Sequence, residues 1–279
     1  AYLPYVIHVL REARGMGIRK LYFLSRDSYI LMKAAQALTE EAEGLELHYL
    51  VVSRRSLLLP YLYGEDEKTY LAASDHNTII RIDSIDKRLS YMGTSREEMR
   101  DKYGIEFPYS KANNIKDQED FLRKIFHSDF TPHLQQTAGE QYRLLEEYFR
   151  QEGLLDGDSC AAVDVGWLGT SRLMMNHILR RKGAKDLHFF YYGVRRDVFP
   201  PSAGRYSTYF RAEEISTETT ILLEHYYSAS PYPSTIAYQR TAHGNIEPVF
   251  GNDEQFRHTP ITQANQDAIE TIAAQINTM

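Results

Sequence analysis

The stretch Lys20-Leu21-Tyr22-Phe23-Leu24-Ser25-Arg26-Asp27-Ser28 decides the fold. Its first five residues are mostly apolar or aromatic, which is typical of a short buried strand. The next four are polar, and apolar residues with helical spacing resume at Ile30 and continue to Leu38. The stretch therefore predicts a strand, a tight loop and a helix in succession.

The same alternation of strand and helix extends on both sides of this stretch. A helix from Leu3 to Ala13 precedes it, and Gly15 and Gly17 provide the stop. Further apolar segments predict strands at 45–52, 159–163, 187–194, 205–211, 235–239 and 246–250, with helices from 170 or 171 to about 181, at 217–227 and from about 262.

Residues 65–152 differ from the rest, because their charged segments have helical periodicity throughout. We expect a helical insertion, acting as a lid, in an α/β domain formed by residues 1–64 and 153–279. Strands that alternate with helices predict a Rossmann-like, mostly parallel sheet with helices on both faces. Ligands of such folds bind outside the carboxyl ends of the strands.

Composition limits the function classes. Of the 279 residues, 43% are hydrophobic and 25% charged, as in an ordinary globular protein. The net charge of −6 argues against a nucleic-acid partner. The single Cys160 excludes a disulfide framework and multi-cysteine metal sites within the chain, which favours a reducing, cytoplasmic location. No apolar run reaches the length of a transmembrane segment. Because the chain starts at Ala1 without an initiator Met, we expect a segment of a longer protein.

The segment from Asp164 to Ser171 predicts a phosphate-binding loop. Gly166 and Gly169 permit close backbone approach, and a helix that begins at Thr170 or Ser171 offers free N–H groups to an anion. An ordinary strand-to-helix turn with a Thr/Ser cap is the alternative. The segment lacks the Lys of a Walker A loop and the G-x-G-x-x-G pattern, which argues against an ATPase and against a dinucleotide-binding protein.

Two further loops carry arginine after predicted strands. Arg26 could bind phosphate oxygens, and Asp27 could pair with it, contact a sugar hydroxyl or hold hydrated Mg²⁺. Arg54 and Arg55 add a second cationic loop. Asp164 could bind ribose hydroxyls or stabilise positive charge on a sugar ring. The alternatives are a helix cap at Asp27, solvated arginines, and an ion pair between Asp164 and Arg26.

An aromatic segment, residues 224–234, is rich in tyrosine and could form an acceptor-glycan surface, with ordinary packing of the tyrosine rings as the alternative. Within it, His225 is the best-placed histidine for acid–base work, although a structural histidine is the alternative. Trp167 could stack on a substrate or anchor the core.

The segments Tyr22–Asp27, Leu50–Arg55, Val163–Thr170 and Ser228–Tyr238, in this order, resemble the glycan phosphoribosyltransferase domain of bacterial dual-domain ribofuranosyltransferases. Members of this family are often labelled as predicted haloacid-dehalogenase-type hydrolases, because a phosphatase domain precedes this region. The resemblance runs from Leu3 to Phe250. It implies a phosphoribosyltransferase-like fold and a covalently linked haloacid-dehalogenase-type phosphatase domain outside this chain.

The resemblance also implies an activity: transfer of 5-phosphoribosyl from phosphoribosyl diphosphate (PRPP) to a glycan of a bacterial surface polysaccharide, such as an O-antigen, with the assistance of Mg²⁺. The phosphatase domain would then remove the 5-phosphate to leave ribofuranose. The matching positions make Arg26, Asp27 and Asp164 catalytic, with Asp27 also the metal ligand. They assign substrate binding to Ser25, Ser53, Arg54, Arg55, Gly166, Trp167, Gly169, Thr170, Ser171, Glu224 and His225.

The chain departs from the pattern in places. Ordinary phosphoribosyltransferases have two adjacent acids before a Thr-Gly-x-Thr turn, whereas Val163 precedes Asp164 here, and Ser28 stands where many relatives have Gly. A dehalogenase-type phosphatase needs Asp-x-Asp after a strand, but Asp156-Gly157-Asp158 precedes its strand.

The alternative functions are a non-catalytic module that binds phosphorylated sugar or glycan, and a nucleotide-sugar glycosyltransferase.

Overall fold

The segment that the sequence marks most clearly forms β1 (Lys20–Leu24), an interior strand of the sheet. In the computed structural model, which describes residues 2–69, 71, 84–194, 203–211, 214, 216–223, 228, 230, 232–252 and 260–276, β1 is buried along its whole length. It pairs in parallel with β2 (Glu46–Leu50) on one side and β3 (Cys160–Asp164) on the other. Parallel strands β4 (His188–Val194) and β5 (Tyr206–Arg211) complete the order β2-β1-β3-β4-β5. The described residues thus confirm the α/β, Rossmann-like parallel sheet.

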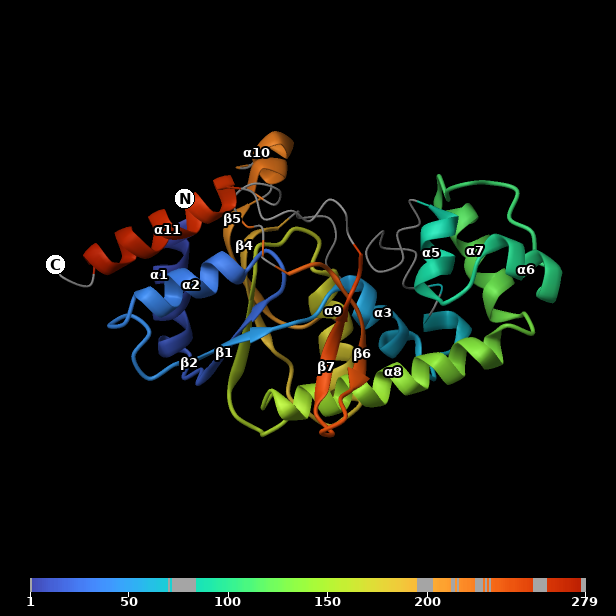
Figure 1. Ribbon diagram of the computed structural model, residues 1–279, viewed down its shortest axis with the longest axis horizontal. Coiled ribbons are helices and arrows are strands. Elements are labelled where there is room, and N and C mark those ends of the chain that lie inside the picture. The colour runs from blue at the N-terminus through green and yellow to red at the C-terminus, as the bar shows by residue number, and fades with distance from the viewer. Residues whose placement is uncertain are drawn as a thin grey trace.

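Two hydrophobic clusters cover the two faces of this sheet, because successive side chains of a strand point to opposite faces. Leu21 and Phe23 of β1 face one cluster, and Tyr22 and Leu24 face the other. The first cluster includes residues of α1 (Tyr2–Gly15), α2 (Tyr29–Ala37) and α11 (Pro260–Ile276), and the second includes residues of α3 (Arg54–Leu62), α8 (Thr131–Gln151) and α9 (Thr170–Arg180) (Figure 1).

The described part of the segment between α3 and β3 consists of helices joined by loops, as its periodicity predicts. Ser84, Ser95 and Asn114 each accept a hydrogen bond from a backbone N–H in the first turn of the following helix, which explains where those helices begin. Residues of these helices belong to the same cluster as α3 and α9. The helices are α5 (Ile85–Tyr91), α6 (Arg96–Tyr103), α7 (Ile115–Phe126) and α8, and Figure 1 shows α5, α6 and α7 together at one end of the molecule. A lid function for them stays a prediction.

The C-terminal part adds the short α10 (Thr217–Leu222) and an antiparallel hairpin of β6 (Thr235–Arg240) and β7 (Ile246–Phe250). The hairpin lies beside α8, because Gln141 and Gln151 of that helix exchange hydrogen bonds with Tyr238 and Ile246. No helix in the described part of the chain is both long and apolar enough to cross a membrane.

Two local predictions were wrong. The strand that ends at Leu50 is an edge strand in which Leu50 alone is fully buried, because it pairs on one side with β1 and has no second neighbour in the sheet. Ser53 to Ser56 is not a loop: Ser53 is the N-cap of α3, and Arg54 and Arg55 lie in its first turn.

Candidate functional site

The order of the strands sets the position of the candidate site. Strand β2 lies on one side of β1 and β3 on the other, so the connections diverge between β1 and β3, which is the usual ligand position in such sheets. The loop after β1 and the loop after β3 both begin at this point. The Ser28 hydroxyl in the first loop donates a hydrogen bond of 3.0 Å to the Val163 carbonyl at the end of β3. The structure therefore brings together the two loops that the sequence selected.

Hydrogen bonds from Ser25 tie the first loop to the end of β2. The Ser25 N–H donates to the Leu50 carbonyl and the Ser25 hydroxyl to the Val52 carbonyl, at 3.0 and 2.7 Å. These bonds show that Ser25 positions the loop, whereas its predicted contact with substrate stays a prediction. Arg26 and Asp27, next in the chain, are half-buried.

The carboxylates of Asp27, after β1, and Asp164, at the end of β3, interact electrostatically. Burial, together with the negative charge of Asp27, raises the pKa of Asp164 to about 7. The backbone N–H groups of Gly166 and Val165 and the charge of Arg54 act in the opposite direction. Asp27 in the loop after β1, Arg54 in the first turn of α3 and Asp164 at the end of β3 thus form one electrostatic group.

The adjacent Arg54 and Arg55 point to different partners. Arg54 is exposed and its charge acts on Asp164. The guanidinium of Arg55 lies 4.8 Å from the centre of the Tyr91 ring at the end of α5, a cation–π contact. Because the two residues are in one helical turn, they cannot both face the same point. The geometry favours Arg54 as the site residue and Arg55 as a link between α3 and α5.

The loop after β3 depends on its glycines. Gly166 has a φ of +131°, and a Cβ there would lie 2.0 Å from the Gly193 carbonyl oxygen in β4, so no other residue fits without displacement. Gly169, at φ +63°, is the N-cap of α9 and has no side chain to occupy the first N–H groups of that helix. The peptide bonds Gly166–Trp167 and Ser25–Arg26 are both cis.

Three residues beside these glycines differ in exposure. Thr170 is 4% exposed and Ser171 is half-buried, both in the first turn of α9. Trp167 is 9% exposed and meets Tyr192 edge to face within the core. Little of its ring is accessible to a substrate, which agrees with the core-anchor alternative.

The remaining predicted residues have different outcomes. Glu224 and His225 lie outside the described residues. Ser53 uses its hydroxyl to cap α3 and to donate a hydrogen bond to the Thr235 carbonyl. Among the described residues no cluster of three or more His, Cys, Asp or Glu side chains could hold a metal by itself.

The Asp156-Gly157-Asp158 segment has a structural role at the opposite end of β1. Lys20 Nζ lies 3.0 Å from an oxygen of Asp156 and 2.9 Å from one of Asp158. The hydrogen bond to Lys20 holds the pKa of Asp158 below its usual range. This arrangement agrees with the expectation that the segment is not a phosphatase motif.

Sequence reasoning did not assign Tyr29 and Tyr49 to the site. Tyr29 begins α2 directly after the Arg26–Ser28 loop, and Tyr49 lies one residue before the end of β2. A signal was available, since aromatic residues that immediately flank a predicted ligand loop are candidates for stacking.

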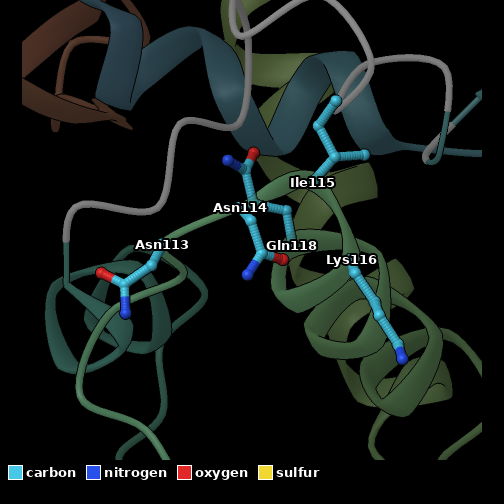
Figure 2. Close-up of a pocket in the computed structure, with 5 residues that line it drawn as sticks. All are labelled: Asn113, Asn114, Ile115, Lys116 and Gln118. Carbon is cyan, nitrogen blue, oxygen red and sulfur yellow. The ribbon is translucent and has the colours of Figure 1, made fainter.

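A hollow lies away from the strand ends, around the N-terminus of α7 (Figure 2). Asn114 there caps α7 through the Asp117 N–H. The hollow is lined by Asn113, Asn114, Ile115, Lys116 and Gln118. These residues carry one charge, that of Lys116, and include no carboxylate or histidine, so they offer little for catalysis.

Comparison with known proteins adds no assignment: no family model and no curated protein matches the chain.

Proposed function

We propose that the chain transfers a 5-phosphoribosyl group from PRPP to a hydroxyl of a glycan acceptor. The observation that carries this proposal is the convergence of Arg54, Asp27 and Asp164 at the point where the strand connections diverge, next to the glycine loop that opens α9. A donor with two phosphate groups and a sugar that develops positive charge needs cations, free N–H groups and a carboxylate in one crevice.

The phosphate groups have two separate partners in this arrangement. The first N–H groups of α9, beside Thr170 and Ser171, suit the 5-phosphate, because a helix N-terminus attracts an anion and Gly169 leaves it accessible. Arg26 and Arg54 suit the diphosphate, because each guanidinium offers several donors to phosphate oxygens. The two cations compensate the charge that builds up on the leaving diphosphate.

The carboxylates fit a magnesium ion that is held mainly by the substrate. Mg²⁺ keeps several waters and uses one or two carboxylates together with substrate phosphates, so a three-residue protein cluster is unnecessary. Asp27 is the residue that would hold it, with Asp164 nearby. When bound, the ion would neutralise diphosphate charge.

Asp164 acts on the sugar in this mechanism. The bond between ribose C1 and the diphosphate oxygen breaks, its electron pair leaves with the diphosphate, and the acceptor hydroxyl oxygen forms the new bond to C1. Positive charge on the ring is stabilised by ionised Asp164, whose pKa near 7 falls when a cation approaches. Asp27 and His225 are the candidates to accept the hydroxyl proton.

Calorimetric titration with PRPP, with and without Mg²⁺, tests the donor site without an acceptor. We expect saturable, Mg²⁺-dependent binding that weakens at least tenfold in Arg26→Ala and Arg54→Ala, since each change removes a charge-assisted contact of about 1.5–3 kcal/mol. Arg55→Ala should cost less, because Arg55 stacks on Tyr91.

Arg11→Ala is the matched control, because this exposed arginine pairs with Glu41 on the surface and should leave PRPP affinity unchanged. Absence of PRPP binding by the parent chain under both conditions would refute the proposal. Release of diphosphate on addition of acceptor would then distinguish a transferase from a module that only binds the donor.

A further inference from the structure

Four aromatic rings, two exposed and two half-buried, cluster beside the candidate site. We define the aromatic surface as Tyr29, Tyr49, Tyr232 and Phe250. Tyr232 and Phe250 are stacked, with ring centres 5.9 Å apart and planes 14° from parallel, and they are 44% and 37% exposed. Tyr29 meets Tyr49 edge to face at 5.4 Å, and both rings lie within 6.4 Å of Tyr232. Four distant segments of the chain thus contribute to one surface.

Buried hydrogen bonds hold this surface in place. Ser230, only 1% exposed, accepts from the Tyr49 hydroxyl at 3.2 Å and from the Tyr232 N–H at 3.0 Å. The Gly251 N–H donates to the Ser234 carbonyl at 2.9 Å, which fixes the backbone next to Phe250. Since the rings are ordered before any ligand arrives, binding to them would lose little conformational entropy.

The aromatic surface lies next to the proposed transfer chemistry. Tyr29 is two residues from Asp27 in the chain. Burial raises the pKa of the Tyr49 hydroxyl, and the charge of Asp27 acts on it in the same direction. A molecule resting on these rings therefore has its groups within electrostatic reach of Asp27.

We propose that the aromatic surface binds the acceptor glycan through the apolar C–H face of a pyranose ring, an inference that rests on the proposed transfer function. A sugar has one apolar face and a rim of hydroxyls, and the surface offers ring faces together with phenol hydroxyls. The surface lies beside Asp27, and Lys33 Nζ lies 5.7 Å from the centre of the Tyr29 ring, so that groups of both charges flank it. The same position brings an acceptor hydroxyl toward the candidate base.

An array of bacterial surface oligosaccharides, probed with the purified chain, tests this proposal. We expect the parent chain to retain pyranose-containing glycans and the double variant Tyr232→Ala/Phe250→Ala to retain them at least tenfold more weakly. Tyr206→Ala is the matched control, because Tyr206 is 39% exposed on β5 at the opposite edge of the sheet. Tyr232→Phe keeps a ring of the same shape and should keep retention.

The outcomes separate this inference from the donor site. The inference is overturned if the parent chain retains no glycan, or if the double variant retains glycans as well as the parent does. It is also overturned if the chain self-associates through the same rings, because the surface would then bind a second copy of the chain. PRPP affinity, measured in parallel, should be the same in the double variant. If PRPP fails to bind the parent chain while glycan retention depends on Tyr232 and Phe250, the donor assignment fails and the glycan surface stands as part of a binding module.

Discussion

Asp164 shows how one residue can combine a structural cost with a chemical role. Its carboxyl group lies at the end of a buried strand near a second acid, so ionisation is unfavourable there, and its pKa rises to about 7. The N–H of Gly166, at 3.4 Å from Oδ1, only partly compensates. A group that is close to half-ionised near neutral pH can respond strongly to a bound cation.

The pKa of Asp164 predicts a specific dependence of stability on pH. The raised pKa means that Asp164 binds a proton more tightly in the folded state than in the unfolded state, where the pKa of an Asp side chain is about 3.9. The free energy of unfolding therefore falls as the pH rises from about 4 to 7 and this contribution is constant above that range. Asp164→Asn removes this titrating group. As the pH rises across this interval, the free energy of unfolding of the variant should therefore increase relative to that of the parent by at most about 4 kcal/mol.

Urea denaturation of both proteins at pH 4.5, 6 and 8, values chosen to span the interval, measures this difference. Asp27→Asn serves as an intermediate case, because it removes the second cause of the raised pKa and leaves burial in place. A stability difference that stays constant with pH would contradict the assignment.

Helix α3 shows how a single element can join three parts of the molecule. Its N-cap Ser53 accepts from the Arg55 and Ser56 N–H groups, both at 3.1 Å, and donates to the Thr235 carbonyl at the start of β6. Its first turn carries Arg54 toward the candidate site and Arg55 toward α5. The cap therefore fixes both the helix and the hairpin, which contributes Phe250 to the aromatic surface.

Ser53→Ala should lower the free energy of unfolding more than the loss of a simple cap. We expect about 1 kcal/mol for the cap and about 1 kcal/mol for the bond to Thr235. Ser95→Ala is the matched control, because the Ser95 hydroxyl caps α6 by accepting a hydrogen bond from the Glu98 N–H, and a loss of about 1 kcal/mol is expected. Equal losses in urea denaturation would show that the bond to the hairpin contributes nothing.

At the scale of the whole molecule, the helices between α3 and β3 share a hydrophobic core with the sheet. Ile85, Leu89 and Phe121 belong to the same cluster as Tyr22 of β1 and Met174 of α9. Separate domains would have separate cores. We infer that the sheet and these helices stabilise each other.

This shared core predicts a single unfolding transition. Trp167 is the only tryptophan and is buried beside the sheet, so its fluorescence reports the strand ends. Far-ultraviolet circular dichroism reports mainly the helices, many of which lie between α3 and β3. The two signals should give the same midpoint in urea. An earlier transition by circular dichroism alone would show that the helical segment unfolds independently.

The sequence by itself determined the elements and the loops between them. The apolar runs of β1, β3 and β4 and the periodicity of α1, α8 and α9 are local properties, readable because each element must bury one face or one stripe. The choice of the loops at Arg26 and Asp164 followed, since ligands of parallel sheets bind at the carboxyl ends of strands.

Only the tertiary structure decided which of these residues meet. Strand order placed β1 between β2 and β3 and so brought Asp27 toward Asp164. Within the first turn of α3, Arg54 and Arg55 point in different directions. Tyr232 and Phe250, distant from Tyr29 in the chain, complete the aromatic surface around it. Such contacts depend on long-range packing of surfaces, a property that no local window of sequence contains.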